Sequence, residues 1–330
     1  MARFFVLFFL MLPLWIPCGL RPLRIFGSLQ ADTTGGCPDE CDCPPSFPVA
    51  MYCDGRGLTV MPTIPSRVKY LYLQNNAITA VSDSALVNAT NLEWLMMHHN
   101  QLTSDAFMQL QGLERLYLQH NNLTTFPSNL PRTLRDLRIN HNKIKKVMYS
   151  ADLEGMDNLT ILYLHDNAVT DMGTSLKALK SLTLLDISSN KLTKALPENL
   201  HQLYLESNSI DSLPEGFFSR FTQLQYVRMA HNQLTDKGIP ANTFNVTGLV
   251  ELDLSYNKLE RIPPVSTTLQ HLYMQANQIK EFTLGSFCSV MDVTNFSKLR
   301  TLRLDGNEIT RQDIPTESTL CLRLASSIEV

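Results

Sequence analysis

Eleven asparagines recur along most of this chain at intervals of 18 to 30 residues. Each follows leucines or similar apolar residues at fixed offsets of three, five and eight positions, in the pattern L-x-x-L-x-L-x-x-N-x-L, which persists from Val68 to Ile309. Units with such a period cannot bury their apolar faces alone, so they must stack on one another as a solenoid. The asparagines are Asn76, Asn100, Asn121, Asn142, Asn167, Asn190, Asn208, Asn232, Asn257, Asn277 and Asn307.

The repeated pattern is that of a leucine-rich repeat, which places a short strand around its two central apolar residues. The buried asparagine amides are predicted to bond the backbone of neighbouring turns and so form a ladder. Prolines in the short repeats, at Pro62, Pro127 and Pro263, favour an extended convex side. We therefore predict a leucine-rich-repeat solenoid, an α/β-type horseshoe with mostly parallel β structure on its concave face, little helix, and disulfide caps at both ends.

The order of segments along the chain follows from the apolar start, the repeats and the cysteines. An apolar run from Phe4 to Ile16 follows a basic start, which is typical of a secretory signal and too short for a membrane span. No second such run occurs downstream, and a formal net charge of −3 gives no bias toward nucleic acid. We expect a secreted chain with a signal peptide at 1–19, a short extension at 20–36, an N-terminal cap at 37–67, repeats at 68–310, a long loop at 280–298 in the penultimate repeat, and a C-terminal cap at 311–330. The 18-residue step before Asn208 predicts a shortened convex loop around Leu196.

Six of the seven cysteines remain if Cys18 leaves with the signal peptide, and an even number suits an oxidising compartment. Four precede the first repeat with the spacing C-x3-C-x-C-x9-C, and two bracket the last repeat. Disulfide caps would cover the apolar ends of a solenoid. A zinc knuckle is the alternative for the first four, but they lack paired C-x2-C units. Of three connectivities we favour Cys37–Cys43 with Cys41–Cys53, and we assign Cys288 to Cys321.

The caps carry a family resemblance. The segments 37–45 and 50–54, the long penultimate loop and the terminus at 320–324 together resemble a class II small leucine-rich proteoglycan, over residues 37–330. The resemblance implies a protein of the extracellular matrix that binds fibrillar collagen, with type I expected, and modulates fibril assembly and diameter. Concave faces in this family also pair, so a homodimer remains open. Such proteins usually carry an N-terminal tyrosine-sulfate segment, but the first tyrosine here is Tyr52, so no role for tyrosine sulfate is expected.

Five N-glycosylation sequons occur, and none falls on a predicted strand. Three of them lie four residues before the leucine that opens the next repeat, so they form one column along the solenoid. Glycans would line the edges and leave the concave sheet open. The resemblance implies that some are extended as keratan sulfate, and plain N-glycans are the alternative. The acceptor residues are Asn88, Asn122, Asn158, Asn245 and Asn295.

Residues that flank the central apolar strand positions should point out of the core. The middle column mixes tyrosines with charges of both signs, which is typical of a protein-binding surface, because tyrosine and arginine contribute much of the energy at interfaces. Mixed signs disfavour a nucleic-acid or heparin stripe. A solvated face is the alternative, and flanking columns add further charges such as Asp136 and Glu206. The candidate collagen contacts in this column are Tyr117, Arg138, Tyr163, Tyr204, Arg228, Tyr273 and Arg303.

A second group of candidate contacts comes from the resemblance alone. The loop after the last ladder asparagine is implicated in collagen binding in this family through an acid followed by a base. Glu308 matches the acid, but the position two residues on is Thr310, and the nearest base is Arg311. Glu308 and Arg311 are therefore candidates, with ordinary solvated loop residues as the alternative.

Histidines precede the ladder asparagine in three consecutive repeats, at His99, His120 and His141, and again at His231. Neighbouring imidazoles about 5 Å apart could share a metal ion. Turn histidines of a repeating template are the simpler interpretation, because the sequence identifies no third or fourth ligand and no second-shell partner. We therefore predict no metal and no cofactor.

The sequence also lacks the motifs of catalysis. There is no nucleophile elbow, no H-E-x-x-H and no phosphate loop, so we predict a protein that is not an enzyme. The alternative function is a soluble module that sequesters a growth factor such as TGF-beta, or acts as a signalling ligand, through the same tyrosine-rich sheet.

Overall fold

A computed structural model describes residues 36–103, 107, 109–145, 153–170, 175–192, 200–219, 221–288 and 294–330. The predicted signal peptide at 1–19, almost all of the extension at 20–36, and the shortened loop around Leu196 lie outside these ranges. Of the predicted long loop, 280–288 and 294–298 are described. In this part of the chain no helix is long and apolar enough to cross a membrane.

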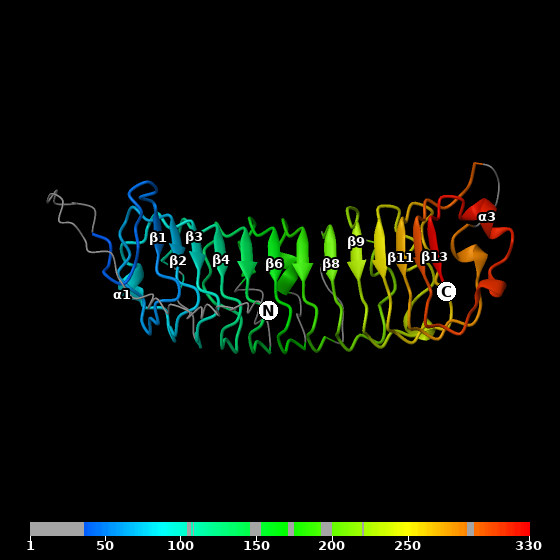
Figure 1. Ribbon diagram of the computed structural model, residues 1–330, viewed down its shortest axis with the longest axis horizontal. Helices are drawn as coiled ribbons and strands as arrows, with labels where there is room; N and C mark the ends of the chain where they lie inside the picture. Colours follow the sequence, from blue (N-terminus) through cyan, green and yellow to red (C-terminus); the bar gives the residue numbers. More distant parts are fainter. Residues whose placement is uncertain are drawn as a thin grey trace, which may run out of the picture. The chain divides into compact units, whose positions relative to one another are not determined.

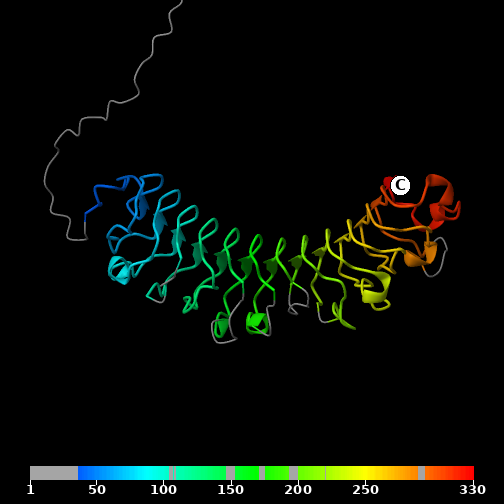
Figure 2. The same ribbon diagram turned by 90° about the horizontal axis from the view of Figure 1, so that it is seen from below.

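The described residues form one parallel sheet in which the strand order follows the chain order, and each three-residue strand is joined to the next by a connection much longer than the strand itself (Figure 1). Its strands line the concave side of the repeat array, and the loops and short helices lie on the convex side (Figure 2). The strands are β1 Ala50–Tyr52, β2 Tyr70–Tyr72, β3 Trp94–Met96, β4 Arg115–Tyr117, β5 Asp136–Arg138, β6 Ile161–Tyr163, β7 Leu184–Asp186, β8 Gln202–Tyr204, β9 Tyr226–Arg228, β10 Glu251–Asp253, β11 His271–Tyr273, β12 Thr301–Arg303 and β13 Ser327–Glu329.

Among the described residues, helix is confined to single turns, which confirms the prediction of little helix. The connections that contain Pro127 and Pro263 are extended, as expected for a residue that cannot donate to an α-helical ladder. The helical turns are α1 Asp83–Leu86, η1 Ser175–Ala178, η2 Asp236–Gly238, η3 Leu284–Ser286, η4 Arg311–Asp313 and α3 Ser318–Cys321.

The core is a stack of leucines between the sheet and the convex loops. The middle residue of each strand from β2 to β12, such as Leu116 and Leu302, is fully buried. Most residues on either side of it stay half-exposed or exposed, because successive side chains of a strand point to opposite faces. Parallel pairing is in register, so each position sits beside its equivalent in the next repeat.

The asparagine ladder forms as predicted. In the repeat of Asn100, the side-chain Oδ1 accepts the backbone N–H of Ile78 at 3.0 Å, and Nδ2 donates to the carbonyls of Leu73 at 2.9 Å and Met97 at 3.1 Å. All eleven asparagines make the equivalent bonds to their own turn and the preceding one, for example Asn76 and Asn307 at the two ends. The ladder thus satisfies backbone groups that have no partner within their own repeat.

The residue before each ladder asparagine adopts the left-handed conformation. Its φ is between 50° and 59° in ten repeats and 74° at Gly306. Asparagine, aspartate and histidine are enriched in this conformation, and it is costly for most other residues. This requirement accounts for the position of His99, His120, His141 and His231.

Both ends are closed by the predicted disulfides. Cys37 pairs with Cys43 and Cys41 with Cys53, and Cys288 pairs with Cys321. The caps also extend the sheet, since β1 and β13 pair in parallel with the first and last repeat strands although neither follows the repeat pattern. The exact segment bounds given above stay predictions.

Candidate functional site

The concave face carries a lattice of stacked aromatic rings and guanidinium groups. Arg138 lies between two tyrosines of the neighbouring strands, with its guanidinium carbon 4.5 Å from the ring centroid of Tyr117 and 5.1 Å from that of Tyr163. Its Nε and Nη2 donate to the two carboxylate oxygens of Asp136 at 3.2 and 3.0 Å. The hydroxyl of Tyr117 donates to the same carboxylate at 2.9 Å. The guanidinium is therefore held in one orientation before any ligand arrives.

Asp136 departs from the expectation that flanking residues point into solvent, because it is only 4% exposed. It is buried because Arg138 and Tyr117 cover it and supply three hydrogen bonds to its carboxylate. Burial lowers the pKa of the Arg138 guanidinium, but the hydrogen bonds and charge of Asp136 more than compensate, so the net pKa is raised. The pKa of Tyr117 is raised by burial and then by Asp136.

The arrangement of an arginine held by a neighbouring acid recurs further along the column. Arg228 lies 5.4 Å above the ring of Tyr204 and donates through Nε to Glu251 at 2.7 Å. Near the last strands, Arg303 donates to both oxygens of Asp305 at 3.1 and 3.0 Å. Each of these arginines is therefore anchored by an acid of the same or the next repeat. The carboxylates neutralise the arginines in part, which explains how a face rich in arginine keeps mixed charge.

The first strands carry an aromatic platform beside this lattice. Tyr52 stacks on Tyr72 with ring centroids 4.6 Å apart, and Tyr70 meets Trp94 edge-on at 5.0 Å. The guanidinium of Arg115 lies 4.3 Å above the ring of Trp94. Tyr52 lies in the N-terminal cap, so the cap contributes to the concave face as well as closing the core.

The loop candidates lie apart from these contacts. Glu308 is exposed, with Oε2 3.9 Å from Nζ of Lys280, and Arg311 is the exposed first residue of η4. Arg303 instead contacts Asp305 and Glu329, the last residue of β13. The sheet candidates and the loop candidates thus belong to different groups of contacts.

At the exit of the strands, the predicted histidine row forms a stack. The ring centroids of His99 and His120 are 4.2 Å apart, and those of His120 and His141 are 4.1 Å apart. The stack continues to His165, whose ring meets His141 edge-on at 5.3 Å. His165 lies two positions before its ladder asparagine, one position off the row that the sequence analysis followed, and so it was missed.

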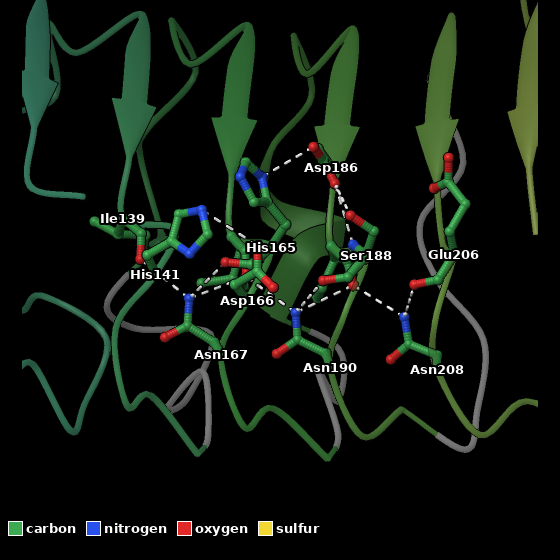
Figure 3. A network of polar contacts seen from close by, with 12 residues as sticks. Ile139, His141, His165, Asp166, Asn167, Asp186, Ser188, Asn190, Glu206 and Asn208 are labelled. Atoms are coloured by element: carbon green, nitrogen blue, oxygen red, sulfur yellow. Dashed lines mark hydrogen bonds and ion pairs between the residues drawn. The ribbon is translucent and has the colours of Figure 1, made fainter. Parts of the chain in front are cut away.

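Acids complete this cluster, as Figure 3 shows. His141 Nε2 lies 3.3 Å from an oxygen of Asp166, and His165 Nδ1 lies 2.9 Å from an oxygen of Asp186. Burial lowers the pKa of His165, but its bond to Asp186 and the nearby acids outweigh burial and raise it overall. Burial raises the pKa of Asp186, but its interactions with His165 and Ser188 lower it by more, so the net pKa falls below its ordinary value. Burial raises the pKa of Glu206, in the next repeat, to about 7.

Comparisons with known proteins place this geometry in a family. The chain is 54% identical to fibromodulin of Bos taurus and 52% identical to fibromodulin of Homo sapiens, in both cases over 94% of this chain and 84% of the relative. It is 47% identical to lumican of Gallus gallus over 90% of each chain. The chain belongs to the class II small leucine-rich proteoglycans. Family profiles described as leucine rich repeat match residues 66–123, 132–192, 222–241 and 248–267.

Solved structures agree on the fold. A chain in the octameric complex of Latrophilin 3, Unc5D and FLRT2 superposes with a TM-score of 0.66 at 26% identity, over 89% of this chain and 85% of that chain. The leucine-rich repeat domain of APL1 superposes with a TM-score of 0.62 at 24% identity, over 76% of this chain and 66% of that chain, and supports the fold alone.

Membership in the class II small leucine-rich proteoglycans indicates a core protein of the extracellular matrix, with a structural or binding role rather than a catalytic one. Within the family, the segments 304–309 and 320–326 indicate fibromodulin rather than lumican as the more similar member. Identities of 52–54% to the fibromodulins, against 42–47% to the lumicans, confirm that interpretation.

All five predicted acceptor asparagines lie outside the strands. Asn122 is half-buried within a turn, and its backbone N–H donates to the carbonyl of Leu102 at 2.9 Å. Asn158 is exposed, and its Nδ2 donates to the carbonyl of Arg132 at 3.0 Å. The remaining acceptors are also exposed, namely Asn88, Asn245 and Asn295.

Proposed function

We propose that this protein is a secreted extracellular-matrix proteoglycan core that binds fibrillar collagen, type I in the first instance, and limits the lateral growth of fibrils. The observation that carries the proposal is the lattice in which Arg138 is fixed between Tyr117 and Tyr163 and anchored on Asp136. A guanidinium that is already ordered loses little entropy when it bonds a ligand, and its planar donors suit backbone carbonyls and carboxylates.

The dimensions of the lattice suit an extended rod. Between β4 and β11, which carry Tyr117 and Tyr273, there are seven strand spacings of about 4.8 Å, or roughly 34 Å. That length corresponds to about eleven residues of a polyproline-like chain at roughly 3.1 Å per residue. Collagen chains expose backbone carbonyls and charged side chains along such a length, so Arg138 and Arg228 would each meet a different segment, and Arg303 on β12 would lie one strand beyond it.

Glycans would supply the steric part of the mechanism. Acceptors outside the strands leave the concave face accessible, while N-linked chains, some of them extended as keratan sulfate, would keep neighbouring fibrils apart. We propose Asn88, Asn158, Asn245 and Asn295 as the more readily occupied sites, since Asn122 is half-buried. Mass spectrometry of glycopeptides from the secreted protein tests this order directly.

The proposed binding face is tested with purified type I collagen and the secreted, deglycosylated protein. Fibril formation is followed by turbidity, co-sedimentation gives the affinity, and electron microscopy gives fibril diameter. The wild type should delay assembly and produce thinner fibrils. Arg138→Gln should weaken binding about 5- to 30-fold, the loss of one interface residue worth about 1–2 kcal/mol. Arg261→Gln removes the same charge from a side chain that is 73% exposed outside the strands, and should bind like the wild type.

The loop candidates Glu308 and Arg311 are tested with separate variants in the same collagen-binding assay. If the loop contributes, the charge reversals Glu308→Lys and Arg311→Glu weaken binding without affecting the lattice. If they bind normally and Arg138→Gln does not, the sheet alone carries the contact. Unchanged fibrils and no co-sedimentation of the wild type would exclude the collagen proposal and leave sequestration of a growth factor such as TGF-beta, tested by saturable binding and a cell reporter, as the better account.

A further inference from the structure

Three metal-ligating side chains converge at the strand exit of two adjacent repeats. His141, His165 and Asp166 each offer one ligand atom, and these atoms all lie within 4.8 Å of one another (Figure 3). We propose that His141, His165 and Asp166 form a binding site for a divalent transition metal ion of the zinc class, with its remaining coordination position open to water or an external ligand.

The backbone already fixes the positions from which the ligands project. His141 and Asp166 both precede a ladder asparagine and have φ of 51° and 52°. The N–H of His141 donates to the carbonyl of His165 at 3.0 Å, and the N–H of Asp166 donates to that of Ser188 at 3.1 Å. The turns are thus tied to each other and to the next repeat, which lowers the entropy lost on binding an ion.

The cluster also has the outer-shell partner that metal-binding histidines commonly use. Nδ1 of His165 lies 2.9 Å from Asp186, whose carboxylate accepts from the N–H and the hydroxyl of Ser188 at 3.1 and 2.7 Å. Nδ1 of His165 is buried and makes no well-aligned hydrogen bond, so a small rotation of the ring would let it donate to this carboxylate. A carboxylate at Nδ1 favours the tautomer with its proton there and leaves the Nε2 lone pair free for a metal. Asp186 is therefore a positioning residue.

The donor set selects the ion. Two imidazoles and one carboxylate suit zinc and similar borderline ions, whereas calcium and magnesium require mostly oxygen ligands. In a tetrahedral site with bonds of about 2.0–2.1 Å the ligand atoms are roughly 3.4 Å apart, so closure from the observed spacing needs movements of about 1 Å or less. The side chains of His141 and Asp166 are 39% and 41% exposed, which leaves them room to rotate.

The test uses the full secreted protein, dialysed against a chelator and titrated with zinc chloride by calorimetry. We expect a component of one zinc per chain that His165→Gln removes and Asp166→Asn weakens at least tenfold. Asparagine is tolerated at the left-handed position, so the second variant should remain folded. His231→Gln is the control for a histidine-to-glutamine change, because His231 occupies in its repeat the place that His141 has in its own, but it stacks on Tyr256.

Cobalt provides a readout that a purely structural role would not change. Bound Co²⁺ in the wild type should give the visible absorption of a nitrogen- and oxygen-ligated tetrahedral site, and Asp186→Asn should lower the affinity about 10- to 100-fold. The proposal is overturned if the wild type and Asp166→Asn bind zinc identically, or if no saturable binding occurs. Loss of binding in His120→Gln with retention in His165→Gln would equally overturn it, and would place the ion in the histidine stack.

Discussion

Replacement of one ladder asparagine tests whether the ladder stabilises the solenoid as its geometry indicates. Asn232 is 3% exposed and lies in the middle of the array. Its Oδ1 accepts the N–H of Ile210 at 3.0 Å, and Nδ2 donates to the carbonyls of Leu205 at 2.9 Å and Met229 at 3.1 Å. The substitution Asn232→Ala removes all of these bonds while adding no bulk.

The cost can be worked out group by group. The carbonyl of Met229 also accepts from Asn257 at 3.0 Å, so it keeps a partner. The carbonyl of Leu205 likewise keeps the bond from Asn208 at 3.1 Å, so only the N–H of Ile210 is left without a partner. A buried polar group left without a partner costs about 1–3 kcal/mol. We therefore expect Asn232→Ala to lower the free energy of unfolding by about 1–3 kcal/mol.

The assay is urea unfolding of the disulfide-intact secreted protein, followed by far-ultraviolet circular dichroism. Asn91→Ala is the matched control, because Asn91 is exposed and makes one bond, to the carbonyl of Ser66 at 2.9 Å. It should cost less than about 1 kcal/mol. If both variants unfold within about 0.5 kcal/mol of each other, the ladder bonds do not hold adjacent repeats together and the reasoning fails.

Three further substitutions probe other features. Burial raises the pKa of Glu206 from 4.5 to about 7, so between these pH values the folded state holds a proton that the unfolded state has released, and the protein loses stability as the pH rises through this range. Glu206→Gln should remove this loss. In urea titrations from pH 4 to 8 the variant should gain about 1–2 kcal/mol relative to the wild type, after allowance for the partial exposure of the side chain. Gly238→Ala would place a Cβ 2.1 Å from the carbonyl oxygen of Asp211 and should cost more than about 2 kcal/mol by thermal unfolding, whereas Gly285→Ala, with no atom within 4 Å, should cost less than about 1. Cys321→Ser opens a disulfide with a sequence separation of 33 and should lower stability by about 2–4 kcal/mol, measured against the wild type under the same non-reducing conditions.

The fold was predictable because the repeat places several columns of leucine and similar apolar residues in the core and one asparagine column beside them. Each position is repeated eleven times, so a local error cannot shift the register of the whole sheet. The strands β1 and β13 were not predictable in this way, since 50–52 and 327–329 do not follow the pattern. They belong to the caps and pair with the first and last repeat strands, whose outer backbone groups would otherwise have no partner in the sheet.

The site was predictable only as far as single columns. The tyrosines and arginines of the concave face follow from alternation, but the burial of Asp136 does not, because it depends on Arg138 and Tyr117 closing over it from the same and the preceding strand. His165 was missed for a similar reason. It contacts His141 and Asp186 from a neighbouring column, and such diagonal contacts depend on side-chain conformation rather than on spacing along the chain.

The columns that were predictable and the contacts that were not both result from the in-register stacking of repeats. Each side chain meets its equivalents in the repeats before and after it, so a column behaves as a one-dimensional sequence whose neighbours are 18 to 30 residues apart in the chain. The column that contains Arg138 alternates rings with charges and can contact an extended ligand along its length. The column of His141 and Asp166, three positions further on, ends in a compact cluster that suits a single ion. The fully buried strand leucines and the ladder asparagines lie in other columns. A substitution at Arg138 should therefore alter only the proposed collagen surface, and one at Asp166 only the proposed zinc site, while the core remains intact. Collagen binding and zinc binding measured on both variants would show whether the two surfaces act independently.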